Sequence, residues 1–255
     1  MGTFTINRAT LTTSKTPNLV SPTNWYKTRA GLKAQMNKKW ALYKDTINTV
    51  AINSAMPSAL IFSFMMIESG GVNEIGKTGL YPGLMKFNRT LVYERIEKEK
   101  NSDRMSAAEE KILNDNNIYL TKKSDGTYKL TGSGLDSGTK HISTNVMLVP
   151  KFNITVSAML LGQYFDAMVE WVGYKDTNPN AGDEALKVFA CMAIRYNAGM
   201  GNWDKWKDRI KPLSWNQLGS KDYAPFLPLE SRTYVKKLLG TNGSLDIAYN
   251  DLLIT

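Results

Sequence analysis

The chain has 255 residues, of which 42% are hydrophobic and 22% are charged, proportions typical of a folded globular domain. Lysine and arginine outnumber aspartate and glutamate by 32 to 23, and the net charge of +9 fits plain solubility or attraction to a polyanion, such as nucleic acid, anionic lipid or acidic wall polymers. No apolar run approaches the ~18 residues that a bilayer-spanning helix needs, so we expect no transmembrane segment.

The N-terminal segment, residues 1–22, is rich in threonine, serine and asparagine and contains Pro17 and Pro22. We interpret it as a flexible arm that precedes the folded part, residues 23–255. The segment has no apolar stretch after a basic start, so it lacks the features of a secretory signal peptide. We therefore expect synthesis in the cytoplasm.

Two helices are predicted next. Apolar residues spaced by three, four and seven indicate a helix over residues 24–50. A strongly apolar helix is predicted over residues 57–69, because Pro57 suits a first helical turn and Gly70-Gly71 suits a helix end. Glu68 occupies the last turn of this second helix.

The middle of the chain is more polar. Residues 72–89 are rich in glycine and are predicted to form an ordered loop, followed by a charged helical stretch from residue 91 to about residue 116. Residues 118–130 are predicted to form a β-hairpin, because Asp125-Gly126 is a favoured hairpin turn between residues typical of strands. Residues 131–144 are predicted to form a further loop.

The C-terminal half returns to helical periodicity. A helix begins at Asn153, a buried helix follows Gly182-Asp183, and short helices are predicted over residues 203–209, 230–239 and 245–253. The predicted fold class is therefore mainly α, with one small β-hairpin.

Few catalytic chemistries fit these residues. His141 is the only histidine, which argues against a zinc hydrolase and against a hydrolase with a histidine base. Cys191 is the only cysteine, which excludes an intramolecular disulfide, and its apolar surroundings favour a buried, inert thiol over a nucleophile. We expect no metal and no cofactor, and carboxylate chemistry is the strongest remaining option.

Glu68 is the best candidate for such chemistry. A carboxylate at the C-terminal end of an apolar helix is disfavoured by the helix dipole and by desolvation, so both effects are expected to raise its pKa. A raised pKa would keep the carboxyl group protonated as a general acid. On this feature alone, a solvent-exposed glutamate before a glycine stop is an equally good interpretation.

Five segments share an order typical of one enzyme family. They are Met56-Pro57 with the helix that ends in Ile67-Glu68-Ser69-Gly70-Gly71 and Asn73, then Gly83-Leu84-Met85-Lys86-Phe87, Asn153-Ile154, Ala193-Ile194-Arg195-Tyr196-Asn197-Ala198-Gly199 and Glu230-Ser231-Arg232-Thr233-Tyr234-Val235. In this order the chain resembles the lytic transglycosylases, whose fold is that of goose-type lysozyme. The resemblance covers about residues 50–89 and 150–240. We interpret residues 90–149, which it does not cover, as an insertion.

The resemblance implies a peptidoglycan-cleaving enzyme. Glu68 would protonate the glycosidic oxygen between N-acetylmuramic acid and N-acetylglucosamine, and would then act as base on the muramyl 6-hydroxyl to form a 1,6-anhydro product. Tyr196 would direct its hydroxyl at the substrate's acetamido group or the transition state. Asn197 would brace the backbone of the site, and Ser69 would orient Glu68.

The remaining site residues follow from the same resemblance. Gly83, Met85, Phe87 and Tyr234 would line the sugar groove, between the Glu68 helix and the Tyr196 region. For Met85, Phe87 and Tyr234, packing in the core is an equally good interpretation.

Lys86 departs from the family's pattern, in which a glutamine follows Gly-Leu-Met. An ammonium close to Glu68 would lower the pKa of that carboxyl group and oppose its role as an acid. We therefore favour a Lys86 that points outward, to the peptide stem or lactyl carboxylate of the substrate.

Three alternatives stay open. A hydrolytic lysozyme would need a second carboxylate about 5–5.5 Å or about 6.5–9.5 Å from the acid, and no motif places Glu74 or Asp166 there. A non-catalytic wall-binding virion module would keep the fold without the activity. A nucleic-acid-binding protein is disfavoured, because the basic residues are scattered along the chain.

The expected partners are peptidoglycan glycan strands, with other virion tail proteins as further partners. The composition and the resemblance together suggest a bacteriophage protein that acts on the bacterial cell wall. It would be either a tail-associated virion component or an endolysin that is released at lysis.

Overall fold

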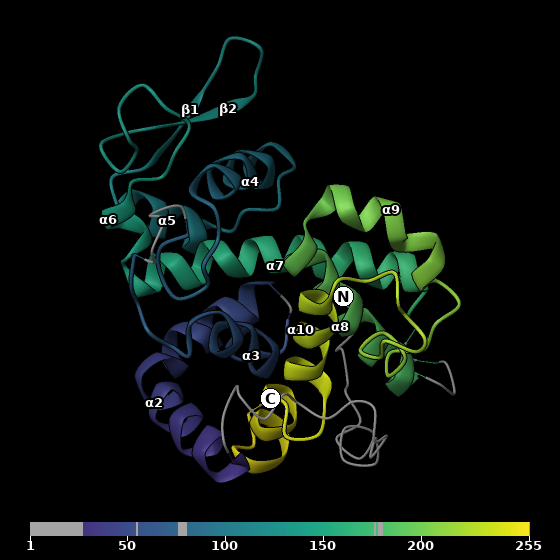
Figure 1. Ribbon diagram of the computed structural model, residues 1–255. Coiled ribbons are helices and arrows are strands. Elements are labelled where there is room, and N and C mark those ends of the chain that lie inside the picture. The colour runs from purple at the N-terminus through teal and green to yellow at the C-terminus, as the bar shows by residue number, and fades with distance from the viewer. Residues whose placement is uncertain (1–27, 55, 76–80, 176, 178–180, 255) are drawn as a thin grey trace. The chain divides into compact units, whose positions relative to one another are not determined.

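The computed structural model describes residues 28–54, 56–75, 81–175, 177 and 181–254 (Figure 1). This part of the chain is mainly helical and contains a two-stranded antiparallel sheet, which confirms the predicted mainly α class with a β-hairpin. Within these residues no helix is both long and apolar enough to cross a membrane. The predicted arm, residues 1–22, and the start of the first predicted helix lie outside the described residues.

The described elements follow one another in this chain order: α2 (Arg29–Ser54), α3 (Ser58–Ser69), α4 (Arg89–Asn101), α5 (Ala107–Asp115), β1 (Tyr119–Lys122), β2 (Tyr128–Thr131), α6 (Thr144–Met147), α7 (Pro150–Val172), α8 (Ala181–Ala198), α9 (Met200–Ile210), α10 (Leu229–Leu239), α11 (Ser244–Asp246) and the π-helical turn η2 (Ile247–Asp251). The apolar helix predicted over residues 57–69 corresponds to α3 and begins one residue later.

The charged helical stretch predicted from residue 91 to about residue 116 consists of two helices, α4 and α5, with a break between them. The chain reverses after α4, where Asp103 has a left-handed backbone conformation with φ of 54°. Ser106 then begins α5 with a capping box, in which its hydroxyl accepts from the Glu109 N–H and the Glu109 carboxylate accepts from the Ser106 N–H. The capping box satisfies backbone donors that a continuous helix would have paired internally.

The predicted hairpin is confirmed. Strands β1 and β2 pair in the register Tyr119 with Thr131 and Lys122 with Tyr128. Gly126 takes the left-handed conformation that the turn requires, with φ of 84°. The Asp125 carboxylate accepts hydrogen bonds from the Thr127 backbone and hydroxyl, and these bonds lower the pKa of Asp125.

The chain divides into two compact units. Unit 1 takes the described residues within Met1–Leu42, Ala55–Ile67 and Gly162–Thr255, and unit 2 takes Tyr43–Ser54 and those within Glu68–Leu161. The predicted insertion, residues 90–149, lies wholly in unit 2. The prediction of one lysozyme-like domain over residues 23–255 stays a prediction.

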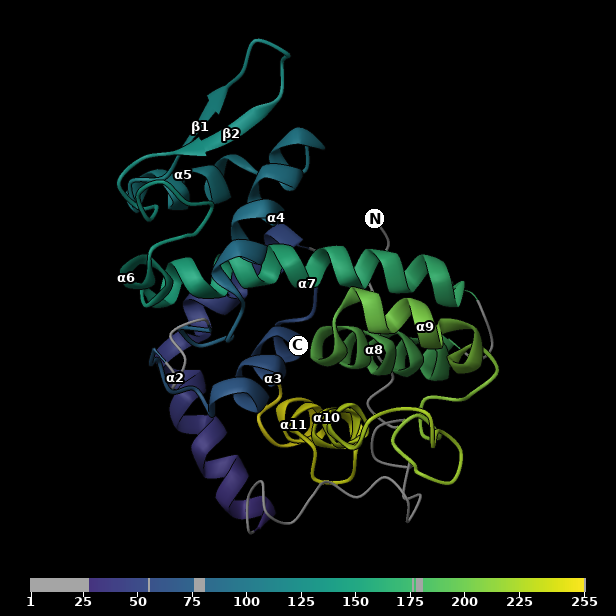
Figure 2. The same ribbon diagram turned by 45° about the horizontal axis from the view of Figure 1, so that its top comes forward.

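Unit 1 is organised around α8, which contacts α9 and α10 (Figure 2). The stretch of α8 from Val188 to Ile194 is fully buried, and each large apolar side chain there contributes about 1.5–3 kcal/mol through burial. In the same unit, Trp40 of α2 meets Phe62 of α3 edge to face, with ring centroids 5.2 Å apart. Aromatic pairs of this kind add directional contacts to the general hydrophobic burial.

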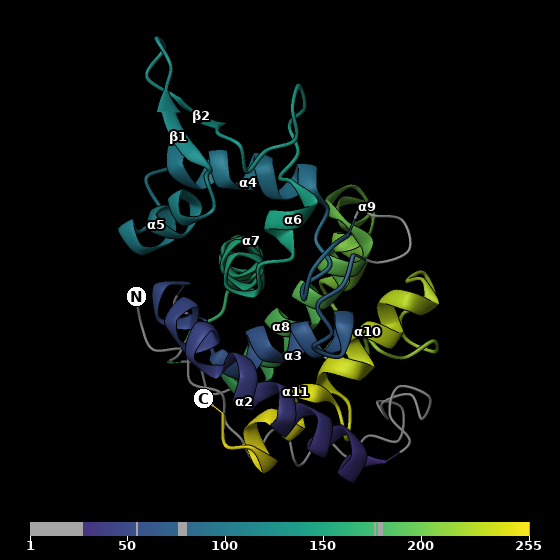
Figure 3. The same ribbon diagram turned by 90° about the vertical axis from the view of Figure 1, so that its left-hand side faces the viewer.

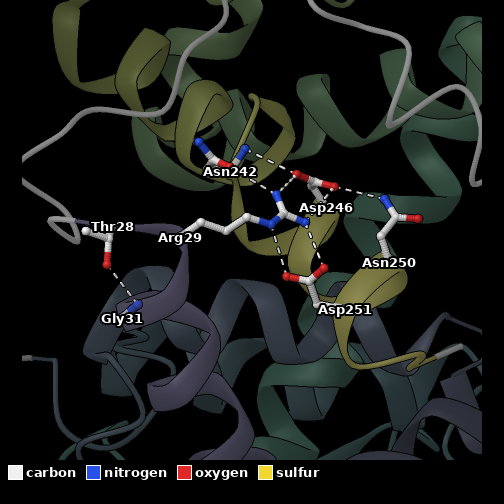
Figure 4. A network of polar contacts seen from close by, with 7 residues as sticks. All are labelled: Thr28, Arg29, Gly31, Asn242, Asp246, Asn250 and Asp251. Carbon is white, nitrogen blue, oxygen red and sulfur yellow. Dashed lines mark hydrogen bonds and ion pairs between the residues drawn. The ribbon is translucent and has the colours of Figure 1, made fainter.

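An ion-pair cluster connects the start of α2 to the C-terminal turns of unit 1 (Figure 4). The Arg29 guanidinium donates to the carboxylates of Asp246 and Asp251, with Nε 3.0 Å from Asp251 Oδ2, and to the Asn242 side chain. Asp246 is only 8% exposed and also accepts from the Asn250 amide. Hydrogen bonds to these carboxylates raise the pKa of Arg29, which stays charged.

Unit 2 places the hairpin against α4 (Figure 3). The Asn101 side chain donates to the Tyr128 carbonyl and accepts from the Tyr128 N–H, and the Glu97 carboxylate accepts from the Leu130 N–H. Lys100 lies over the Tyr128 ring, 5.2 Å from its centroid. Side chains of α4 thus cover the outer edge of β2, which would otherwise leave unpaired backbone groups.

Candidate functional site

Glu68 lies in the last turn of α3, a helix whose residues from Ser58 to Met66 are all buried. A helix that is apolar on every side is stable only in a core, which explains the depth of α3. The Glu68 side chain is half-buried, at the point where the helix leaves the core. Glu68 lies at the C-terminal end of this helix, where the negative end of the helix dipole disfavours a charged carboxylate. The raised pKa of Glu68 stays a prediction.

The turn after Glu68 is tightly defined. Gly70 and Gly71 have φ of 60° and 71°, a left-handed region that glycine occupies at little cost. The Ser69 hydroxyl accepts from the Gly71 N–H at 3.1 Å, and the Ser69 carbonyl accepts from the Val72 N–H. Ser69 therefore stabilises this turn, and its predicted role in orienting Glu68 stays a prediction.

The segment that follows this turn is fastened to the loop Gly83–Phe87 within unit 2. The Glu74 carbonyl accepts two hydrogen bonds, from the Gly83 N–H at 2.9 Å and from the Lys86 ammonium at 3.1 Å. The Asn73 amide donates to the Leu148 carbonyl, just before α7. These bonds fix the chain six residues after Glu68 to two other loops.

Asn153 of α7 holds the same loop from the other side. Its side chain is fully buried, its Oδ1 accepts from the Met85 N–H at 2.9 Å, and its Nδ2 donates to the Pro82 carbonyl at 3.4 Å. Gly83 sits against this amide with φ of 89°, where a Cβ would overlap the Asn153 Nδ2 and lie 2.5 Å from the Met147 carbonyl oxygen. Only glycine fits this position, because both the backbone conformation and the close approach exclude a side chain.

The side chains of this loop are mostly buried. Met85 is 0% exposed and Phe87 is 5% exposed. Their burial supports packing, one of the two interpretations left open by the sequence, over direct contact with sugar. Gly83 is buried as well, so its role here is to admit the Asn153 amide.

Lys86 is directed to Glu74. Its ammonium lies 3.6 Å from the Glu74 carboxylate in addition to its bond with the Glu74 carbonyl, and the Lys86 side chain is only 15% exposed. The backbone of Lys86 is left-handed, with φ of 50°, a conformation that is uncommon for a residue with a side chain. Glu74, one of the two residues considered as a second carboxylate, is thus engaged with a lysine, whereas Asp166 is exposed on α7.

In unit 1, three aromatic rings from three helices form a cluster. Phe64 of α3, Tyr196 of α8 and Tyr234 of α10 have pairwise ring-centroid distances of 5.2–5.7 Å. Tyr234 is 5% exposed, which supports packing, whereas Tyr196 is half-buried. Phe64 belongs to the buried stretch of α3 that precedes Glu68.

The last turn of α8 and the first turn of α10 are joined by a hydrogen bond, which the Ser231 hydroxyl donates to the side-chain Oδ1 of Asn197 at 2.9 Å. Ser231 is 1% exposed and Asn197 is exposed. Asn197 therefore connects two of the five motif segments through its side chain, beside the ring contact between Tyr196 and Tyr234.

In the described part of the chain, no group of three or more His, Cys, Asp and Glu residues is placed to hold a metal ion. Cys191 is fully buried on α8, and burial raises the pKa of its thiol to about 12. A thiol with such a pKa is protonated at neutral pH and is a poor nucleophile.

Three residues connect these segments in ways that the sequence did not predict: Glu74, Asn153 and Ser231. Glu74 had been considered only as a second carboxylate, and Asn153 and Ser231 only as members of motif segments. A buried asparagine in the first turns of a helix otherwise gives no sign of the backbone that it will bind. The predicted groove between the Glu68 helix and the Tyr196 region concerns the placement of the two units and stays a prediction.

A scan against protein-family models finds no matching family, and a search of curated proteins finds no matching relative. The resemblance to the lytic transglycosylases therefore depends on the five motif segments.

Proposed function

We propose that the chain is a peptidoglycan lytic transglycosylase with a lysozyme-like fold, in which Glu68 is the single general acid and base. The main support is the position of Glu68, a half-buried carboxyl group at the negative end of a buried apolar helix. Such surroundings disfavour the charged form of a carboxylic acid, and a general acid must carry its proton at the working pH.

The contacts among the motif segments support the same proposal. The loop Gly83–Phe87 is held against the segment after Glu68 by Glu74 and against α7 by Asn153. Separately, α3 supplies Phe64 to the cluster with Tyr196 and Tyr234. Each motif segment thus contacts another one in its own unit, although they are spread over residues 56–235 of the sequence.

In the proposed reaction, the protonated Glu68 donates its proton to the glycosidic oxygen as the bond to the muramyl C1 breaks. The carboxylate then accepts the proton of the muramyl 6-hydroxyl while that oxygen bonds to C1. One carboxyl group serves both steps because they follow one another in time. Tyr196 would direct its hydroxyl at the acetamido group of the substrate.

Glu68→Gln should abolish cleavage and leave the fold intact, because glutamine keeps the shape but cannot donate and then accept the proton. Turbidity clearing of purified peptidoglycan and circular dichroism would be compared between the two proteins. Substantial clearing by a folded Glu68→Gln protein would show that the acid is elsewhere.

Mass spectrometry of the fragments separates the transglycosylase from the lysozyme. We expect 1,6-anhydro-muramyl ends. Reducing muramyl ends that carry oxygen from labelled water would identify a hydrolase with a second carboxylate, and no cleavage by a folded wild-type protein would favour a wall-binding module. The bacteriophage origin stays a prediction.

A further inference from the structure

The hairpin of unit 2 presents a face that the proposed reaction does not use. Directly paired residues and residues two apart share a face of a sheet, so Tyr119, Thr121, Lys129 and Thr131 form one surface, here called the hairpin face. Tyr119 is 46% exposed, Thr121 and Lys129 are exposed, and Thr131 is half-buried. The opposite face carries Leu130, which is 4% exposed.

Side chains of α4 hold the hairpin at the outer edge of β2. Asn101 and Glu97 of α4 bind the backbone of Tyr128 and Leu130, and Lys100 stacks over the Tyr128 ring. A two-stranded hairpin alone is only marginally stable in water, so these contacts are what orders it. The hairpin face is therefore a preformed surface.

The Tyr119 ring is also fixed in its direction. Its hydroxyl donates to the Asn117 side chain at 3.3 Å, and Asn117 has a left-handed backbone with φ of 56°. Gly132 has φ of 117°, and a Cβ there would overlap the Asn117 carbonyl and lie 3.0 Å from Tyr119 Cδ2. Single exposed apolar side chains are common on protein surfaces. The Tyr119 ring differs because its hydroxyl is hydrogen-bonded to Asn117 and its edge lies close to the backbone of Gly132.

The other side chains of the hairpin face complement the ring. The hydroxyls of Thr121 and Thr131 lie 2.8 Å apart and form a polar strip beside Tyr119. Lys129 is the diagonal neighbour of Tyr119, at about 7–8 Å by strand geometry. The hairpin between Tyr119 and Thr131 carries three lysines and one aspartate, so it attracts anionic ligands.

We propose that the hairpin face is a second binding surface for peptidoglycan, separate from the reaction at Glu68. The Tyr119 ring stacks on the apolar face of a sugar, the threonine hydroxyls bind its polar substituents, and Lys129 binds a carboxylate of the adjacent peptide stem. The choice of peptidoglycan as ligand rests on the proposed function. The surface holds the enzyme on its insoluble substrate between cleavage events.

The test is cosedimentation of the full-length chain with insoluble purified peptidoglycan, in the Glu68→Gln background so that binding is measured without cleavage. Tyr119→Ala should raise the apparent Kd about threefold to tenfold, the range expected for loss of one aromatic contact. Tyr119→Phe keeps the ring and loses only its hydrogen bond to Asn117, so it should bind more tightly than Tyr119→Ala does. The matched control is Tyr223→Ala, which removes a tyrosine of similar exposure, 51%, in unit 1 and should not change the Kd.

Lys129→Met tests the charge without removing the ring. It should weaken binding about twofold to fivefold, as expected for an exposed ion pair, and only while the peptidoglycan carboxylates are free. On methyl-esterified peptidoglycan, Lys129→Met and its parent should bind alike. If hydrogen exchange shows that Tyr119→Ala unfolds the hairpin, the binding of Lys129→Met still tests whether the hairpin face binds peptidoglycan.

Equal Kd values for Tyr119→Ala and Tyr223→Ala, in proteins whose hairpin amides stay protected, would overturn this inference. An equal effect of Tyr119→Ala on binding to double-stranded DNA would overturn peptidoglycan as the ligand. Cleavage by the chain with Glu68 intact is scored in parallel on the same material. Cleavage with unchanged variant binding refutes the hairpin surface alone, whereas variant-sensitive binding without cleavage refutes the proposed reaction alone.

Discussion

Gly83→Ala probes the contact between the Gly83–Phe87 loop and Asn153. The added Cβ would overlap the Asn153 amide and lie 2.5 Å from the Met147 carbonyl oxygen, and the backbone has φ of 89°. A left-handed conformation costs an alanine about 1–2 kcal/mol. Displacement of the Asn153 side chain also leaves the buried Met85 N–H without its acceptor, which costs about 1–3 kcal/mol.

Gly126→Ala is the matched control, because Gly126 has a similar φ of 84° and no atom within 4 Å of its Cβ position. It should therefore show the backbone cost alone. We expect the free energy of unfolding in urea to fall about 1–3 kcal/mol further for Gly83→Ala than for Gly126→Ala.

A double variant makes the test specific to Asn153. In Asn153→Ala the overlap with the amide is absent, so Gly83→Ala should cost less there than in the wild-type chain, by about 0.5–3 kcal/mol. Equal losses for the two glycine variants, or strict additivity of Gly83→Ala and Asn153→Ala, would refute the assigned contact between Asn153 and the loop.

Three further predictions concern other residues. Lys86→Gln should mainly raise KM. It should change the free energy of unfolding by no more than about 1 kcal/mol, since the ion pair of Lys86 with the exposed Glu74 is weak. An upward shift of the alkaline limb of the pH–rate profile would instead place Lys86 beside the catalytic acid. Arg29→Gln should lower the free energy of unfolding by about 1–3 kcal/mol, because Asp246 is left largely buried without its counter-ion. That loss should stay constant across neutral pH, since Arg29 has a raised pKa and is charged throughout; a loss that changes with pH there would contradict the assignment. Cys191 should resist alkylation at neutral pH until the protein unfolds, because its thiol is buried and, with a pKa of about 12, protonated. Rapid labelling of the native chain, detected by mass spectrometry, would contradict its burial.

Local patterns in the sequence were sufficient for several elements. The apolar run before Glu68, bounded by Pro57 and Gly70-Gly71, predicted α3 within one residue at its start. The Asp125-Gly126 pair predicted the hairpin turn. Both succeed because the deciding interactions lie within a few residues along the chain. The break between α4 and α5 had a local signal too, the capping box that begins at Ser106, which the charge pattern obscured.

The sequence proposed residues for the candidate site but did not predict their contacts. Motif order pointed to Glu68, Tyr196 and Tyr234. The sequence did not indicate that Lys86 would bind Glu74, or that Asn153 would hold a loop 68 residues away.

Residue spacing determined by itself which helices and strands form and which of their faces are apolar, since helical and strand periodicity are properties of consecutive residues. Only the tertiary structure decided which buried amide meets which backbone group. A buried N–H or carbonyl must find a partner, and side chains from any part of the chain can supply it, as Asn153 does for Met85. The choice among those partners depends on how the helices pack, which no local pattern specifies.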